Sequence, residues 1–144
     1  TQLQYLDISN NNLQGNIFEI LSNLSHLETL IISNNNFGGQ LPDNYSLTSL
    51  KTLDASNNQF WGNIPSGIQQ LANLTHLNFS KNTLTGTIPN EIANLAQLKS
   101  LKIDRNQLIG DIPDSLMNLT QLQDNASDFS YNALYTSNSQ LSSF

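Results

Sequence analysis

The feature that most constrains this chain is a pattern of apolar residues, asparagine and glycine that recurs with a period of about 24 residues. Copies start at positions 3, 27, 50, 74 and 98, and a degraded sixth copy starts at 122; the second copy is one residue shorter than the others. The copy LKSLKIDRNQLIGDIP carries its recurring residues at Leu98, Leu101, Ile103, Asn106, Leu108, Gly110, Ile112 and Pro113. Such a repeat predicts a solenoid, because each unit can bury its apolar residues only against its neighbours.

Each copy contains two short alternating segments. The Leu-x-Ile alternation of Leu101 and Ile103 predicts a strand with one side chain inward and the next outward. Asn106 follows where the chain leaves this strand, and a buried amide there can satisfy the backbone of the neighbouring coil. The alternation at 108–112 predicts a second strand that ends at Pro113. Further apolar residues then close the core through short helical or 3₁₀ turns.

This arrangement resembles the leucine-rich repeat proteins, in particular the plant-type class with the pattern LxxLxLxxNxLxGxIP. The likeness extends over residues 1 to about 134. It implies an α/β solenoid: a curved, right-handed coil with a parallel β-sheet on the concave side and short helical or 3₁₀ turns on the convex side. This class includes receptor-kinase ectodomains, polygalacturonase inhibitors and bacterial surface proteins. We therefore expect a single leucine-rich repeat domain over 1–144, with a capping segment at 135–144.

The start of that cap has its own signal. Ser137 and Gln140 have the spacing of a capping box, which predicts a helix start, with Leu141 and Phe144 on one helical face.

Composition and motifs exclude several classes of function. The net charge of −6 argues against nucleic-acid binding, which requires a basic surface. No apolar run reaches the length of a membrane span, so we expect no membrane insertion in this segment. The chain has no cysteine, no metal-ligand spacing of His and carboxylates, and no glycine-rich phosphate loop. No Ser-His-Asp set is suggested either, so we expect no cofactor, no metal and no enzymatic activity.

The positions that the repeat leaves free surround each first strand, and all five basic residues fall among them. Since neighbouring parallel strands lie about 4.8 Å apart, we expect Lys81, Lys99, Lys102 and Arg105 to form a basic group that attracts an acidic partner. Alternatively, these cations only keep an exposed sheet soluble, with Asp54 and Asp104 as counter-charges. The candidate ligand-binding residues of the concave face are Lys51, Asp54, His76, Asn78, Lys81, Lys99, Lys102 and Arg105.

Trp61 is a separate, lateral candidate, in an outward position beside Gly62. An exposed Trp can anchor a protein partner or stack on a sugar, although it can equally pack against a neighbouring coil.

We therefore expect a non-catalytic recognition module that binds a protein or peptide ligand on its concave face. Carbohydrate or cell-wall binding through Trp61 and a structural spacer or adhesin segment of a larger surface protein remain open. The sequence carries no signal peptide, and the repeat class alone implies a location outside the cell or at its surface. Six Asn-x-Ser/Thr sequons would accept glycans there, although an Asn-rich repeat generates such motifs unaided.

Overall fold

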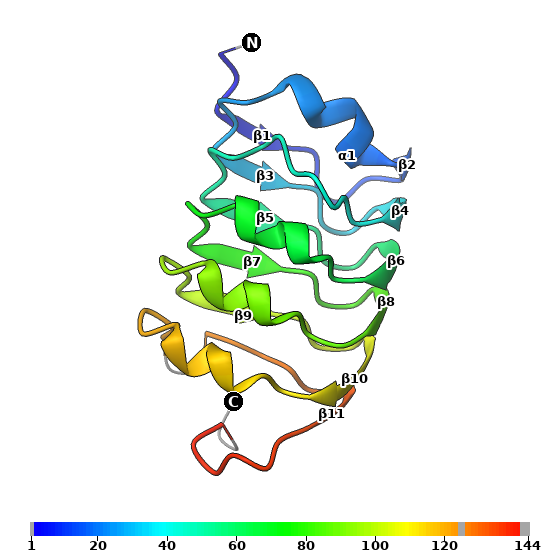
Figure 1. Cartoon of the computed structure of the whole chain (residues 1–144). Coiled ribbons are helices and arrows are strands. Elements are labelled where there is room, and N and C mark those ends of the chain that lie inside the picture. Colours follow the sequence, from blue (N-terminus) through cyan, green and yellow to red (C-terminus); the bar gives the residue numbers. More distant parts are fainter. Residues whose placement is uncertain (1, 124–125, 142–144) are drawn as a thin grey trace.

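The computed structural model describes residues 2–123 and 126–141 as a stack of coils in which two parallel sheets and a row of short helices form three sides (Figure 1). The five-stranded first sheet has the order β1 (Tyr5–Asp7), β3 (Thr29–Ile31), β5 (Thr52–Asp54), β7 (His76–Asn78) and β9 (Ser100–Lys102). The six-stranded second sheet consists of β2 (Gln14–Gly15), β4 (Asn36–Gln40), β6 (Gln59–Asn63), β8 (Thr83–Gly86), β10 (Gln107–Asp111) and β11 (Ala133–Tyr135). This arrangement confirms the expected α/β solenoid.

The remaining side of the stack carries the helical turns. These are α1 (Ile17–Ile20), η1 (Leu21–Asn23), η2 (Ser66–Gln70), η3 (Asn90–Asn94) and η4 (Asp114–Asn118), of which all but α1 are 3₁₀ helices. Prolines precede η2, η3 and η4, where their fixed φ suits the start of a helical turn. None of the helices among the described residues is long and apolar enough to cross a membrane.

The core lies between the three sides and is built from equivalent residues of successive coils. Leu53, Leu77 and Leu101 of the first sheet are paired in register and at most 1% exposed. Burial of each such side chain contributes about 1.5–3 kcal/mol, which it gains only because a neighbouring coil covers it.

The recurring asparagines join each coil to the one before it, and we call them the asparagine ladder. The Asn82 amide donates from Nδ2 to the carbonyl oxygen of Ala55 in the preceding coil at 3.1 Å, and its Oδ1 accepts from the amide of Phe60 at 3.0 Å. The same pair of cross-coil bonds recurs at Asn35, Asn58, Asn106 and Asn132. The ladder therefore satisfies backbone groups of the preceding coil, as predicted.

We predict that Asn82→Ala lowers the free energy of unfolding by at least about 2 kcal/mol, because it leaves a buried N–H and a buried C=O without partners. Asn11 occupies the same position in the first coil, where it is exposed and donates only to carbonyls of its own turn. Asn11→Ala should therefore change stability by no more than about 0.5 kcal/mol. Urea unfolding of the two variants tests this, and equal losses would contradict the ladder's role.

The coil that is one residue shorter has no helix between β4 and β5. Its Tyr45 occupies the position of Ile68, Ile92 and Leu116 in the next three coils and, like them, is buried. The shortened loop lies directly against η2. The approach is so close that a Cβ placed on Gly67 would overlap the carbonyl oxygen of Asp43. The shortened loop therefore requires a residue without a side chain at position 67 of the next coil.

We predict that Gly67→Ala destabilises the fold by about 1–3 kcal/mol, because backbone atoms of a neighbouring coil must move to accept one methyl group. The matched control is Glu91→Ala at the equivalent position of the following coil, where the effect should stay within about 0.5 kcal/mol. Thermal unfolding measures both, and a neutral Gly67→Ala would show that the loop does not press on η2.

The C-terminal segment differs from the capping-box expectation. Residues 136–141 form turns and no helix, and it is Asn138 whose Oδ1 accepts from the amide of Gln140, at 3.0 Å. Leu141 is nonetheless buried in the core, and Asn138 donates to Asp114 Oδ1 at 2.9 Å. Phe144 lies outside the described residues.

Candidate functional site

The outward side chains of the first sheet, with the residues just before and after its strands, form what we call the first-sheet face. Its centre is a shallow depression of about 360 Å³. His76 is paired with Thr52 on one side and Ser100 on the other, which are the residues 24 positions before and after it in the sequence. The lining residues are Thr52, Leu53, Asp54, His76, Leu77, Asn78, Ser100 and Lys102. The fold therefore brings together four of the candidates, namely Asp54, His76, Asn78 and Lys102.

Two of these four candidates also have a local structural role. Asp54 Oδ1 accepts from the amide of Ser56 at 3.0 Å and from its hydroxyl at 2.6 Å. Asn78 Oδ1 accepts from Ser80 in the same way, at 3.1 and 2.7 Å. These short turns explain the serines that follow Asp54 and Asn78, and they fix where the two side chains lie. A ligand would meet a preformed rim of polar groups.

Four of the five basic residues lie at two edges of the first-sheet face, and Lys102 lies between these edges in β9. Lys51 and Lys99 immediately precede β5 and β9, whereas Lys81 and Arg105 follow β7 and β9. Strand β9 therefore separates Lys99 from Arg105. Lys51 is paired with Glu28 at 2.8 Å, while Lys81, Lys99 and Lys102 have no carboxylate within ion-pair distance in residues 2–123 and 126–141.

Lys81 and Arg105 hold an unusual backbone conformation. Equivalent positions of the first three coils are Asn10, Asn34 and Asn57, all in the left-handed region that asparagine tolerates. The next three are Lys81 (φ 54°), Arg105 (φ 52°) and Tyr131 (φ 54°), residue types that adopt this region at a cost of about 1–2 kcal/mol. All three side chains are exposed, so core packing does not explain the substitutions.

Arg105 and Tyr131 also contact each other. The Arg105 guanidinium carbon lies 4.8 Å from the centre of the Tyr131 ring, within the range of a cation–π interaction. Tyr131 is 72% exposed and was missed by the sequence reasoning. Its sequence position could have pointed to it. Tyr131 stands directly before the ladder residue Asn132, and the first three coils have an asparagine at that preceding position. We call Lys81, Arg105 and Tyr131 the edge cluster.

Asp104 lies beside the edge cluster in the position that other coils fill with serine. It is 8% exposed, and its Oδ2 lies 3.9 Å from Nε of Arg105. Burial raises the pKa of its carboxyl above the ordinary value of 3.8, and the charge of nearby Asp128 adds to the rise. The folded state thus binds a proton on Asp104 more tightly than the unfolded state does.

We predict that Asp104→Asn raises the melting temperature at neutral pH. Because the pKa of Asp104 is raised in the folded state, the protonated carboxyl does not destabilise the fold below pH 3.8. As pH rises through the folded pKa the carboxyl ionises, and the free energy of unfolding falls. The gain should therefore disappear at low pH. The control Asp7→Asn should lower stability at neutral pH, because hydrogen bonds from Ser9 lower the pKa of Asp7. Melting curves at several pH values decide this, and a destabilised Asp104→Asn at neutral pH would contradict it.

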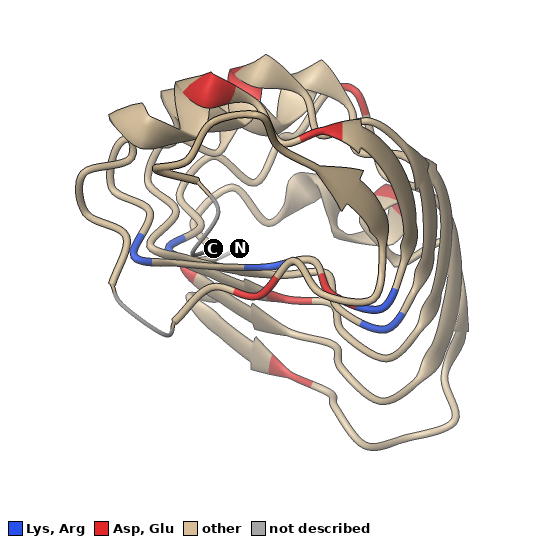
Figure 2. Ribbon diagram, turned by 90° about the horizontal axis from the view of Figure 1, so that it is seen from below, with Lys and Arg blue, Asp and Glu red and all other residues tan. Residues whose placement is uncertain are grey.

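Charge is distributed unevenly between the sides of the solenoid. All five cations lie on the first-sheet face, together with the carboxylates of Asp7, Glu28, Asp54, Asp104 and Asp128. Five further carboxylates, of Glu19, Asp43, Glu91, Asp111 and Asp114, lie on the helices, their loops and the second sheet. Figure 2 shows blue segments only along the layer of the first sheet, while red segments occur on every side. The first-sheet face is nearly balanced, and the other sides are acidic.

Trp61 lies away from the first-sheet face. It belongs to β6 of the second sheet, where it is paired with Gln40 of β4 and Thr83 of β8. Its side chain is 51% exposed and does not pack fully against a neighbouring coil. It borders a pocket of about 530 Å³ that is separate from the depression on the first sheet.

No metal centre is evident in the part of the chain that the structure describes, where no three His, Cys, Asp or Glu side chains come together.

A comparison with known proteins agrees with this geometry. The family model described as "Leucine-rich repeat region" matches residues 1–138. The chain belongs to the leucine-rich repeat family. A stretch of 49 residues is 49% identical to a protein of Arabidopsis thaliana that is named a "probably inactive leucine-rich repeat receptor-like protein kinase". This match covers 33% of the chain and 5% of that protein.

Solved structures of plant receptor ectodomains are similar over nearly the whole chain. Pollen receptor kinase 3 is 32% identical with a TM-score of 0.82, over 92% of this chain and 64% of that one. The ectodomain of the Arabidopsis receptor kinase HAESA, in complex with an IDA peptide hormone ligand, is 31% identical with a TM-score of 0.84. That match covers 92% of this chain and 22% of HAESA. The chain thus spans only part of the length of these relatives.

Proposed function

We propose that this chain is a non-catalytic recognition module, located outside the cell or at its surface, that binds a protein or peptide along the first-sheet face. The observation that carries the proposal is the edge cluster. Lys81, Arg105 and Tyr131 occupy left-handed backbone positions where asparagine fits better, yet their side chains are exposed. Strain retained at an exposed position favours a role for the side chain in binding.

The surroundings of the edge cluster suit a peptide. The depression on the first sheet is lined by Asp54, His76, Asn78 and Lys102, and a segment bound there can continue past Lys102 to Arg105 of the edge cluster. Short turns and paired strands hold these groups, and binding therefore requires little rearrangement. The HAESA ectodomain, whose solved complex holds a peptide hormone, has the same fold, which supports a peptide as the class of ligand.

Charge at the edge cluster favours an acidic group on the partner. Lys81 lies on the coil next to that of Lys102 and Arg105, and Asp104 between them is buried rather than exposed. Arg105 can donate two parallel hydrogen bonds to a carboxylate from the edge of its guanidinium group, while a face of the group contacts the Tyr131 ring. We infer that a ligand carboxylate, from Asp, Glu or a chain terminus, contacts Arg105.

A peptide selection tests this proposal. Peptides from a displayed random library are selected on the native chain, and their affinities are measured for two charge-matched variants. Lys81→Gln/Arg105→Gln should weaken binding about tenfold or more, since it removes charge-assisted hydrogen bonds. Lys51→Gln/Lys99→Gln, at the opposite edge, should change affinity by no more than about twofold. Equal losses in both variants, or none in either, would place recognition elsewhere.

A second candidate is carbohydrate binding, which the half-exposed Trp61 beside a pocket favours. In that case Trp61→Ala would abolish binding to cell-wall oligosaccharides on a glycan array, while Lys81→Gln/Arg105→Gln would retain it. If the chain is only a structural spacer of a larger protein, it should bind neither a selected peptide nor an oligosaccharide in these two assays.

A further inference from the structure

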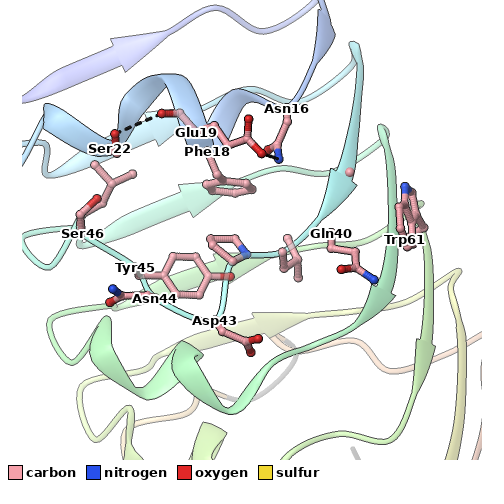
Figure 3. Close-up of a pocket in the computed structure, with 14 residues that line it drawn as sticks. Asn16, Phe18, Glu19, Ser22, Gln40, Asp43, Asn44, Tyr45, Ser46 and Trp61 are labelled. Carbon is pink, nitrogen blue, oxygen red and sulfur yellow. Dashed lines mark hydrogen bonds between the residues drawn. The ribbon is translucent and has the colours of Figure 1, made fainter.

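The short coil leaves an opening on the helical side of the solenoid. Between α1 of the first coil and the helix-free loop of the second lies the pocket of about 530 Å³, within the usual range for ligand pockets. Figure 3 shows Phe18 and Glu19 above it, Asp43 and Tyr45 below it, and Trp61 at its far end. The pocket exists because the loop has no helix like η2 or η3 to fill this space.

The pocket walls are held in place by aromatic packing. The Phe18 ring lies 6.0 Å from that of Tyr45 in an edge-to-face arrangement, and 5.5 Å from that of Phe60 in the core. The amide of Tyr45 donates to Gln70 Oε1 of η2 at 2.8 Å, which fixes the loop from the other side. The pocket is therefore a built feature of the first three coils rather than a gap between loose segments.

Two buried polar atoms in the pocket wall lack partners. The hydroxyl of Tyr45 and Oδ1 of Asn16 are buried without a hydrogen-bond partner among the described residues, and Tyr45 as a whole is only 2% exposed. The equivalent residues of the next three coils are aliphatic, so packing alone does not require a hydroxyl. Burial and the nearby Asp43 raise the pKa of the Tyr45 phenol, which therefore stays neutral. Such orphan groups are uncommon, and at a pocket they suggest a missing polar ligand.

Apart from the Tyr45 hydroxyl, which can donate as well as accept, the polar groups of the wall accept hydrogen bonds or carry negative charge. Glu19 and Asp43 bring two carboxylates to the lining, Asn16 Oδ1 is an acceptor, and no Lys, Arg or His is present there. The Asn16 amide already donates to Glu19 Oε1 at 2.8 Å, which orients both side chains. A ligand with several donors complements the two carboxylates, Asn16 Oδ1 and the oxygen of Tyr45, and an arginine side chain has that property.

We propose that this pocket binds an arginine side chain of a partner protein. The guanidinium enters between Glu19 and Asp43, donates to these carboxylates and to Asn16, and the flanking part of the partner contacts Trp61. Arginine suits the site better than lysine because its planar group offers five donors in several directions and stacks on aromatic rings. The acidic character of the helical side would steer a cationic segment toward it.

The test uses the chain's only tryptophan as its reporter. N-acetyl-arginine amide is titrated while Trp61 fluorescence and the side-chain amide NMR signals of Asn16 and Gln40 are followed. We expect saturable binding in the millimolar range at low salt, as suits so small a probe. N-acetyl-citrulline amide, which has the same shape without the charge, should show no saturable change.

Variants locate the site and separate it from the first-sheet face. Glu19→Gln/Asp43→Asn should weaken arginine binding about fivefold or more, whereas Glu91→Gln, a carboxylate on η3 outside the pocket, should not. Lys81→Gln/Arg105→Gln should bind the probe as the native chain does, so this proposal and the proposed function fail independently. Circular dichroism confirms that each variant is folded.

Several outcomes would overturn the proposal. Equal binding of the citrulline probe, unchanged affinity in Glu19→Gln/Asp43→Asn, or no saturable response to the arginine probe would each do so. A saturable response to methyl glucoside that survives Glu19→Gln/Asp43→Asn would assign the pocket to a sugar instead.

Discussion

The asparagine ladder is the interaction on which the rest of this structure depends. A solenoid turns sharply after each first strand, and at such a turn the backbone groups of adjacent coils cannot all pair with one another. A buried amide supplies a donor to the preceding coil and an acceptor to its next strand, so one side chain replaces two missing backbone partners. Where no preceding coil exists in the structure, at Asn11, the amide bonds only to its own turn. The ladder thus belongs to contacts between coils, which are the contacts that hold such folds together.

The same turn explains why recognition residues can be placed beside a structural one. The residue immediately before each ladder asparagine must adopt a left-handed backbone, yet its side chain points to solvent. Asparagine satisfies the backbone at this position, and Lys81, Arg105 and Tyr131 satisfy it less well. Each coil therefore has one exposed position where a residue other than asparagine costs backbone strain. Coils that carry another residue there are the ones in which we expect a binding side chain.

Much of the fold was predictable because its determinants recur. The period, the two strands per coil, the ladder and the proline-led turns each appear in several copies, and repetition separates them from chance. The register of His76 with Thr52 and Ser100 followed directly from the spacing. The capping helix at Ser137 was wrong, because a single local motif has no repetition behind it and Asn138 made the competing turn.

The candidate site was only partly predictable. Alignment of copies already places Lys99 before and Arg105 after a predicted strand, but the prediction of one basic group overlooked the length of β9 between them. It also hides residues whose importance lies in a departure from the pattern, such as Tyr131, and contacts between side chains at equivalent positions of neighbouring coils, such as the ring of Tyr131 against Arg105. The pocket beside Tyr45 had a sequence trace in the shortened second copy of the repeat, but its walls come from three coils and required the structure.

That shortened copy has a consequence for how such a protein can change. Strands β2 and β4 pair Gly15 with Phe37, and β4 and β6 pair Gly39 with Phe60. The second pair is closer in sequence than the first by the one missing residue, so equivalent positions of the repeat still face each other and both sheets continue without a slip. The whole deletion is absorbed in the loop on the helical side. A change of loop length on the helical side therefore leaves the strand pairing unchanged. A single insertion or deletion there can create or remove a cavity while the first-sheet face keeps its geometry.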